Sequence, residues 1–411
     1  MKRVLATPDP TSISPGKLPG TTYLLTLCQA MNLTAAVVSV TIAALVGDKL
    51  APNHAWATVP YGCQFAAVAL ATYPAASFMR RYGRKNGFLL GAICLIAAGC
   101  VGYDAVRYAN FAHLVVAHAL LGVYVAFANF YRFAAVDGLA PAMRPKGVSL
   151  VVAGGIIAAV SGPLLSIGLR NISGFATFSL CYASFVLLGL ATIALITLWR
   201  PAVAAAAAGQ PAGASSVTSL APTIVAVAIV AAALSYLIMN LLMVQASLLM
   251  ESMCVSFDTS SLAIQGHVIA MFAPSFVTGA ILVRAGHRNT LLAGYALLAG
   301  SAMLGIWGSG LSAVVTGLIM LGVGWNFGYV GGGALLACTL TEHNRHRMQG
   351  INDSIIAIFA TAGAFSPAPL QAWIGWQHTN LLCLALCVAA ACLTWICMRE
   401  TRSSAGEVLR T

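Results

Sequence analysis

Long apolar stretches alternate with short polar or basic gaps along the whole chain. Twelve of these stretches are long enough to cross roughly 30 Å of hydrocarbon, because each residue of a helix advances about 1.5 Å. A helix also satisfies its own backbone hydrogen bonds, as a bilayer requires. We therefore expect an all-α membrane protein with twelve transmembrane helices at about 22–46, 56–79, 87–103, 111–133, 147–168, 175–199, 222–249, 262–283, 290–308, 312–336, 350–373 and 379–398.

Composition supports a location in the bilayer. Of the 411 residues, 60% are hydrophobic and 8% are charged, and the mean hydropathy is +0.88. So few charges cannot cover a soluble globule of this size. The formal net charge is +11, but the lysines and arginines fall in short gaps between apolar stretches, where orientation in a membrane explains them. We expect the lipid bilayer as a partner and no nucleic acid.

The basic residues are distributed unevenly between the two sides of the membrane. If both termini lie in the cytosol, every lysine and arginine is cytosolic except Lys49, Arg107 and Arg170. An excess of basic residues marks cytosolic loops, so this orientation is favoured, and it requires an even number of spans. The N-terminal stretch is basic and then rich in Pro, Ser and Gly, without the apolar core of a signal peptide. It is therefore expected to be a cytosolic tail.

A basic loop motif occurs twice, as RYGRKN at 81–86 and as RAGHRN at 284–289. The two copies follow the second and the eighth apolar stretch, so a duplicated block of six helices is expected. An Ala/Gly/Pro/Ser-rich stretch with the composition of a flexible linker lies between the blocks. The predicted organisation is a cytosolic tail over 1–21, a six-helix bundle over 22–200, a cytosolic linker over 201–220, a second six-helix bundle over 221–398 and a cytosolic tail over 399–411.

This organisation resembles the major facilitator superfamily. The loop signature of that family is matched at a set of positions in the two copies: Arg81, Gly83, Arg84 and Lys85, then Arg284, Gly286 and Arg288. Arg80 and Val283 stand where the family has an aspartate, which removes the interhelix charge contact that the family uses to hold its outward-facing state. The resemblance implies two six-helix bundles that move by alternating access, and a monomer.

The sharpest chemical signal lies in the seventh and eighth apolar stretches. Met239 and Met243 form one couple, and His267 and Met271 form another. A separation of four residues puts both members of a couple on one helix face. Antiparallel packing would place the couples side by side, as two layers about 6 Å apart. Thioether sulfur and imidazole nitrogen are ligands that Cu(I) prefers, so the second bundle is predicted to hold a metal site.

The two couples resemble those of CcoA-type copper importers. That resemblance implies import of copper as a transported substrate, and no cofactor is expected. It further implies a bacterial inner membrane, a supply of copper for cytochrome oxidase assembly and a cytosolic copper acceptor. The residues around His267 and Met271 also resemble a broader clade that includes riboflavin importers.

Four further soft-ligand residues are candidates for a relay. Met250 and Met253 continue the methionine stripe toward the outer end, and Cys28 and Cys63 lie on the first and second spans. The alternative for the methionines is packing, because Met fills gaps in apolar helices generally. His267 has the alternative of a hydrogen-bonded structural role, although an ionisable group inside a membrane is costly and is functional by default. These alternatives stay open.

Polar and aromatic groups at membrane depth favour a different cargo. They are expected to line an aqueous cavity: Gln29, Asn32, Gln64, Asn240, Trp325 and Asn326. Amide hydrogen bonds and aromatic stacking would suit a small organic solute with hydrogen-bonding edges, such as riboflavin or a drug. Import or export of such a solute is the rival hypothesis, and it would tolerate the loss of the methionines.

The acidic residues all lie in loops, tails or helix ends, with Asp353 nearest to membrane depth. A proton-coupled carrier normally needs a protonatable carboxylate or histidine at depth, which leaves His118 and His267 as candidates and transport without coupling as the alternative. Arg132 and Asp137 are expected to form a structural ion pair near the headgroups. No nucleophile with a base and no phosphate-binding loop occurs, so an enzyme is not expected.

Overall fold

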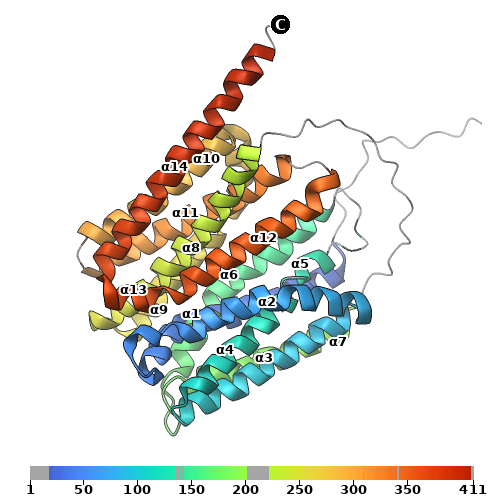
Figure 1. Ribbon diagram of the computed structural model, residues 1–411. Coiled ribbons are helices and arrows are strands. Elements are labelled where there is room, and N and C mark those ends of the chain that lie inside the picture. Colours follow the sequence, from blue (N-terminus) through green and yellow to red (C-terminus); the bar gives the residue numbers. More distant parts are fainter. Residues whose placement is uncertain are drawn as a thin grey trace, which may run out of the picture.

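The structure is a computed structural model that describes residues 18–135, 137, 139, 143–200, 222–308, 310–339 and 342–408. Within these residues the regular elements are helices, and none is a strand. The long helices run side by side (Figure 1). The predicted linker over 201–220 lies outside the described residues, and so does the predicted tail over 1–21 apart from residues 18–21.

The first half of the chain forms α1 to α7 and one short 3-10 helix, η1. Their bounds are α1 Gly20–Leu50, η1 His54–Trp56, α2 Val59–Tyr82, α3 Arg84–Arg107, α4 Phe111–Ala128, α5 Tyr131–Ala134, α6 Arg144–Leu169 and α7 Ser179–Leu198. The second half forms α8 Pro222–Ser252, α9 Phe257–Phe272, α10 Ser275–Trp307, α11 Gly310–Thr339, α12 Glu342–Phe365, α13 Pro367–Trp373 and α14 Gly375–Val408.

These helices make the twelve passes expected from the apolar stretches. Among the described residues, eight helices are long and apolar enough to cross a membrane alone, and a ninth span results when the bent pair of α12 and α13 is counted together. The other passes are α2, α6, and α9 continued by the first part of α10. Two predicted boundaries differ: α10 bends at Gly286 and joins the eighth pass to the ninth, and α14 continues to Val408, past the predicted end at 398.

The two copies of the basic loop motif have the same backbone geometry. Gly83 has φ 85° and ψ 154°, and Gly286 has φ 80° and ψ 161°. A positive φ of this kind is open to glycine at no steric cost, which explains why both copies carry Gly there. Three residues after each glycine, an asparagine side chain donates to a backbone carbonyl, Asn86 to Tyr82 and Asn289 to Ala285, each at 2.9 Å.

The basic side chains of the motif hold neighbouring elements. Arg84 of α3 forms an ion pair with Asp137 at 3.1 Å. The expected pairing of Asp137 with Arg132 stays a prediction. Lys85 donates to the carbonyl oxygens of Thr197 and Trp199, which end α7. In the second half the Arg288 guanidinium lies 3.7 Å from the ring centroid of Trp395. For Arg81 the structure records a contact with the Tyr82 ring at 5.3 Å, and Arg284 is exposed.

The two halves meet at the end of the bundle that carries η1 and α13, which we call the closed end. The Thr58 hydroxyl donates to the carbonyl oxygen of Phe365 at 3.0 Å and accepts from the backbone N–H of Ala368 at 3.4 Å. The rings of Phe178 and Phe257 lie edge to face with centroids 5.1 Å apart. Side chains and backbone of the two halves therefore seal this end together.

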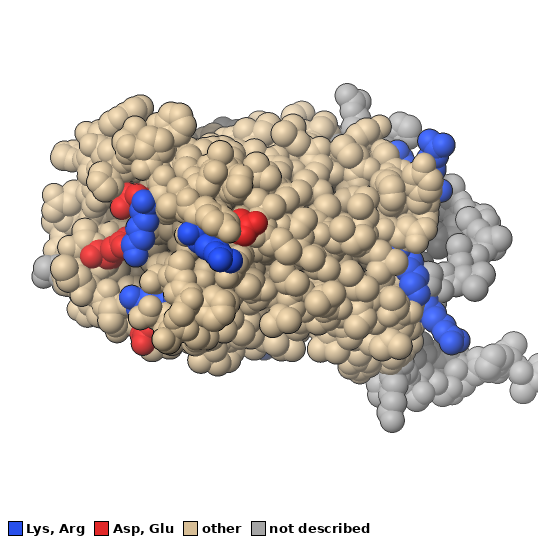
Figure 2. All heavy atoms as spheres, turned by 90° about the horizontal axis from the view of Figure 1, so that it is seen from below, with Lys and Arg blue, Asp and Glu red and all other residues tan. Residues whose placement is uncertain are grey.

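The opposite end, which carries the Gly83 and Gly286 turns, is open between the halves. A cavity of about 350 Å³ is lined there by α5 of the first half and by α8, α11 and α12 of the second. We call this the open end. On the face shown in Figure 2, acidic side chains lie only toward one end, and the other end presents basic side chains alone.

A break in the eighth pass is bridged by a side chain from α11. Between α9 and α10 the chain passes through Pro274, which has no N–H to donate. The Asn326 amide nitrogen donates to the Met271 carbonyl at 2.8 Å and to the Ser275 hydroxyl at 2.6 Å, and its oxygen accepts from the Thr278 hydroxyl at 2.7 Å. One amide thus ties both sides of the break to α11.

Gly62→Ala should weaken the seal at the closed end. A methyl group on residue 62 would overlap the ring of Phe365, and overpacking of this kind costs about 1–3 kcal/mol. Spin labels at the exposed positions Trp56 and Trp373 should move apart in pulsed EPR measurements made without the native cysteines. Adding Phe365→Ala should restore the short distance between the labels. If Gly62→Ala leaves that distance unchanged, the close contact between Gly62 and the Phe365 ring is contradicted.

Asn326→Leu should lower thermal stability in detergent. The variant removes three hydrogen bonds, each worth about 0.6 kcal/mol and at most about 1.7 kcal/mol between membrane helices, so a loss of about 2 kcal/mol is expected. Asn240→Leu is the matched control, because Asn240 makes one such bond, to the Ala360 carbonyl at 3.0 Å. Equal shifts of the melting temperature in the two variants would argue against the bridging role of Asn326.

Candidate functional site

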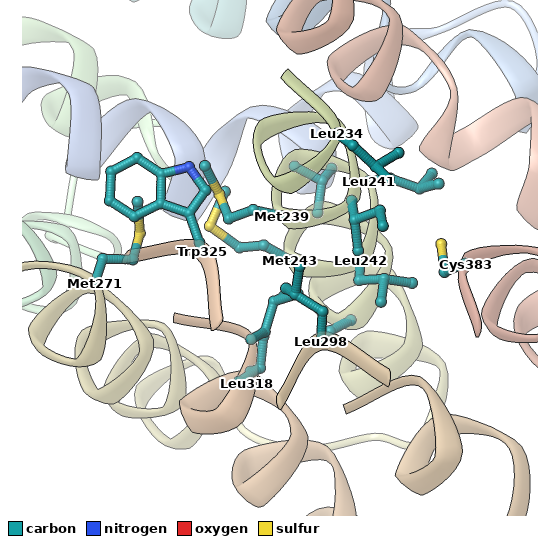
Figure 3. Close-up of a cluster of buried hydrophobic side chains, with 14 of the residues drawn as sticks. Leu234, Met239, Leu241, Leu242, Met243, Met271, Leu298, Leu318, Trp325 and Cys383 are labelled. Carbon is teal, nitrogen blue, oxygen red and sulfur yellow. The ribbon is translucent and has the colours of Figure 1, made fainter. Parts of the chain in front are cut away.

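The methionine couple of α8 faces α9 and α11 inside the second half. Figure 3 shows Met239 and Met243 leaving α8 on the same side and extending toward Met271 and Trp325. The three methionines are 2%, 4% and 8% exposed, and they belong to one cluster of buried apolar residues. The structure therefore brings three of the four predicted metal ligands into one buried region.

His267, the fourth predicted ligand, is fully buried on α9. Its Nδ1 lies 2.7 Å from the carbonyl oxygen of Leu318 on α11. Since a carbonyl can only accept, Nδ1 carries the proton and Nε2 holds a free lone pair. Nε2 is buried and has no hydrogen-bond partner among the described residues. A carbonyl that fixes the tautomer in this way is typical of ligating histidines.

A second feature of the region is a cluster of aromatic rings. Trp325 and Tyr329 stack with centroids 4.9 Å apart and an interplanar angle of 10°. Tyr236 of α8 lies edge to face against both, at 5.6 and 5.7 Å, and Phe272 lies 6.3 Å from Trp325. Phe65 of α2 lies 6.3 Å from Tyr236. The cluster therefore includes rings from both halves of the protein.

Sequence reasoning identified Trp325 and missed the other rings. A usable signal was present, because Trp325 and Tyr329 are four residues apart on an expected helix and so share a face. The contacts of Tyr236, Phe272 and Phe65 join α8, α9 and α2 to one cluster with α11, and no local pattern specifies them.

The amides expected to line a cavity have varied roles. Asn240 and Asn326 use their side chains to tie helices together. Asn32 donates to the Gln29 oxygen at 3.4 Å, and the buried Asn32 oxygen has no partner among the described residues. Gln64 belongs to a polar network within the first half. Asn240 and Asn326 thus have structural partners, and the cavity expected from these six residues stays a prediction.

The network around Gln64 includes His118. The Ser39 hydroxyl donates to the Gln64 oxygen at 2.7 Å, and that oxygen lies 3.1 Å from His118 Nδ1. The Tyr182 hydroxyl lies 3.0 Å from His118 Nε2. Both ring nitrogens thus have partners, in contrast to His267.

The candidate relay residues lie in different places. Met250 is fully buried in the same apolar cluster as Met239. Met253 is 39% exposed and lines a small cavity of about 160 Å³ at the closed end. Cys28 belongs to a separate buried cluster in the first half, and Cys63 is partly buried on α2. Only Met250 shares a buried cluster with the predicted ligands.

The arrangement offers two kinds of chemistry. In the described part of the chain no group of three or more His, Cys, Asp or Glu side chains could hold a metal ion, so a metal here would depend on the thioethers and the single imidazole. The aromatic rings offer flat surfaces for stacking instead.

The chain is similar to known membrane transporters along most of its length. A model of the Major Facilitator Superfamily matches residues 228–410. The riboflavin transporter RfnT of Brucella anthropi is 33% identical over 390 residues, which cover 93% of this chain and 97% of that protein. The uncharacterized MFS-type transporter YdeG of Bacillus subtilis is 26% identical over 369 residues, which cover 84% of each chain.

Solved structures show the same fold. The D-xylose-proton symporter superposes with a TM-score of 0.70 at 13% identity, over 91% of this chain and 96% of that one. A bacterial homologue of the lysosomal transporter Spinster, in an inward-facing and occupied conformation, gives 0.67 at 15% identity, over 92% and 96%. With twelve helical passes, a pair of matching loop motifs and these relatives, the chain belongs to the major facilitator superfamily and is a membrane transporter rather than an enzyme.

Proposed function

We propose that this transporter imports a flat heteroaromatic solute such as riboflavin. The observation that carries the proposal is the stack of Trp325 and Tyr329, with Tyr236 and Phe272 packed against it. Offset and edge-to-face ring contacts are worth about 0.5–1.5 kcal/mol each beyond the burial of area. The similarity to a riboflavin transporter over 93% of the chain supports the same cargo.

The position of the cluster suits alternating access. Phe65 brings a ring of the first half to within 6.3 Å of Tyr236 in the second, so a flat solute held there would contact both halves. The closed end is sealed by Thr58 and Phe365, while the open end leads to the cavity beside Tyr329. A rocking motion of the halves would open the closed end and close the open end around the solute.

The orientation of the protein in the membrane is inferred from the charges. The motif arginines and lysine lie at the open end, and an excess of basic residues marks the cytosolic side. We therefore assign the open end to the cytoplasm and the closed end to the outside, in a bacterial inner membrane with both termini cytosolic. Whether a proton accompanies the solute depends on His118 and His267, the two histidines at depth.

Tyr329→Leu should reduce riboflavin uptake about fivefold, because the stacking surface is lost and a ring contact is worth about 1 kcal/mol. Uptake of radioactive riboflavin by cells that express the protein measures the effect. Tyr329→Phe is the matched control, since it keeps the ring, and it should transport normally. Cells that express the wild-type chain without gaining riboflavin uptake would contradict the proposed function.

Copper(I) is a second candidate cargo, and the free Nε2 of His267 favours it. The nitrogen is buried, holds a lone pair and has no partner in the described residues. Met239, Met243 and Met271 lie in one buried cluster, and Met271 follows His267 by four residues on α9. Thioether and imidazole are the ligands that select Cu(I). On this candidate, copper would pass inward from one ligand pair to the next, reach a cytosolic acceptor and serve cytochrome oxidase assembly.

Met239→Leu, Met243→Leu, Met271→Leu and His267→Gln should each abolish copper accumulation if copper is the cargo, at unchanged protein level. Radioactive copper uptake is measured in the same cells as riboflavin uptake. Met303→Leu is the control, because Met303 is 44% exposed on α10 and should have no effect. Four variants that accumulate copper as the wild type does would remove this candidate and leave the flavin proposal intact.

A further inference from the structure

The cavity at the open end begins at the aromatic cluster. Tyr329 stacks on Trp325 and also lines the cavity. Gly333, one turn further along α11, lines it as well, and a Cβ there would meet nothing within 4 Å. The volume of about 350 Å³ falls within the range of small-molecule sites. Space for a solute is thus continuous with the ring of Tyr329.

A basic side chain from the first half and an amide and a carboxylate from the second half line this cavity. Arg132 comes from α5, and Asn352 and Asp353 come from α12. We call the cavity lined by these three residues and Tyr329 the polar vestibule. Its walls also include apolar side chains, among them Ile356. The vestibule therefore combines a ring at one side with a small set of hydrogen-bonding groups.

Two of those groups have unused hydrogen-bonding capacity. The Nε of Arg132 is buried and has no partner, and the same is true of the side-chain oxygen of Asn352, a residue that is 7% exposed. The Asn352 amide nitrogen donates to the Asp353 carboxylate at 3.1 Å. The vestibule therefore offers one cationic donor and, in Asn352 and Asp353, acceptors. Buried polar groups without hydrogen-bond partners are costly. A ligand that supplies partners to Arg132 and Asn352 would therefore bind more tightly.

We propose that the polar vestibule is a binding subsite for an uncharged polyhydroxylated chain carried by a flat ring. A hydroxyl group both donates and accepts, so neighbouring hydroxyls satisfy Arg132 and Asn352 together. A phosphate dianion would accept from Arg132, but it has no hydrogen to donate to the Asn352 oxygen, and it would meet the Asp353 carboxylate as a like charge. The ring would lie against Tyr329 and the chain would extend toward α12. This subsite rests on the proposed flavin transport and specifies which flavins are carried.

The proposal makes riboflavin, with its neutral hydroxylated chain, a better cargo than two close relatives. Lumiflavin has the same ring system with a methyl group in place of that chain, and flavin mononucleotide ends the chain in a phosphate. Purified protein in liposomes is tested for riboflavin uptake in the presence of each competitor. We expect lumiflavin and flavin mononucleotide to compete at least tenfold more weakly than unlabelled riboflavin.

Two variants test the residues themselves. Asn352→Leu should raise the KM for riboflavin about tenfold and leave competition by lumiflavin unchanged, because only the chain meets residue 352. Asp353→Asn should strengthen competition by flavin mononucleotide, because the repulsion is removed. Ser354→Ala is the matched control: its hydroxyl is exposed and donates to the Gly350 carbonyl of its own helix. Melting temperatures in detergent check that each variant is folded.

The outcomes separate this subsite from the function on which it rests. Riboflavin uptake with equal competition by lumiflavin would overturn the subsite and keep flavin transport, and so would an Asn352→Leu variant that is folded and has an unchanged KM. Absence of uptake of any flavin by the wild-type protein would overturn both. A preference for riboflavin that Asn352→Leu abolishes supports both.

Discussion

A helix that breaks inside a bilayer leaves backbone groups that water cannot satisfy, and this constraint shapes the second half of the protein. The eighth pass breaks at Pro274, and Asn326 of α11 supplies partners on both sides of the break. The same amide fixes the backbone at Met271, one residue before Phe272. The break and its polar bridge thus decide where a thioether and an aromatic ring of α9 meet Trp325, which directly precedes Asn326 on α11.

Close approach of α9 and α11 depends on a residue without a side chain. A Cβ at Gly322 would lie 2.6 Å from the carbonyl oxygen of His267, a distance that real Cβ atoms essentially never show. With the helices this close, the Leu318 carbonyl comes within 2.7 Å of His267 Nδ1. A small residue on one helix thereby sets the tautomer of a histidine on the other. Membrane helices in general use small residues to bring backbones together.

The sequence was sufficient for the features that depend on local pattern. Apolar length gave the twelve passes, and the two glycines of the repeated motif have the positive φ that explains their presence at 83 and 286. The soft-ligand couples were visible as spacings of four. Contacts between distant helices were not visible: Asn326 was expected to face a cavity and bridges a helix break, and the ion pair of Arg84 with Asp137 was not expected. Composition cannot distinguish these uses of the same side chain.

The two candidate cargoes depend on the same helices, which explains why sequence alone did not separate them. Met271 and Phe272 are consecutive on α9, so their side chains leave the helix about 100° apart. Met271 extends toward the methionines of α8, while the Phe272 ring lies 6.3 Å from Trp325. Trp325 is 5% exposed and contributes to the walls of both regions. A change in its position would therefore alter the thioether group and the ring stack together, which makes the cargo a property of how α9, α8 and α11 pack rather than of any one motif.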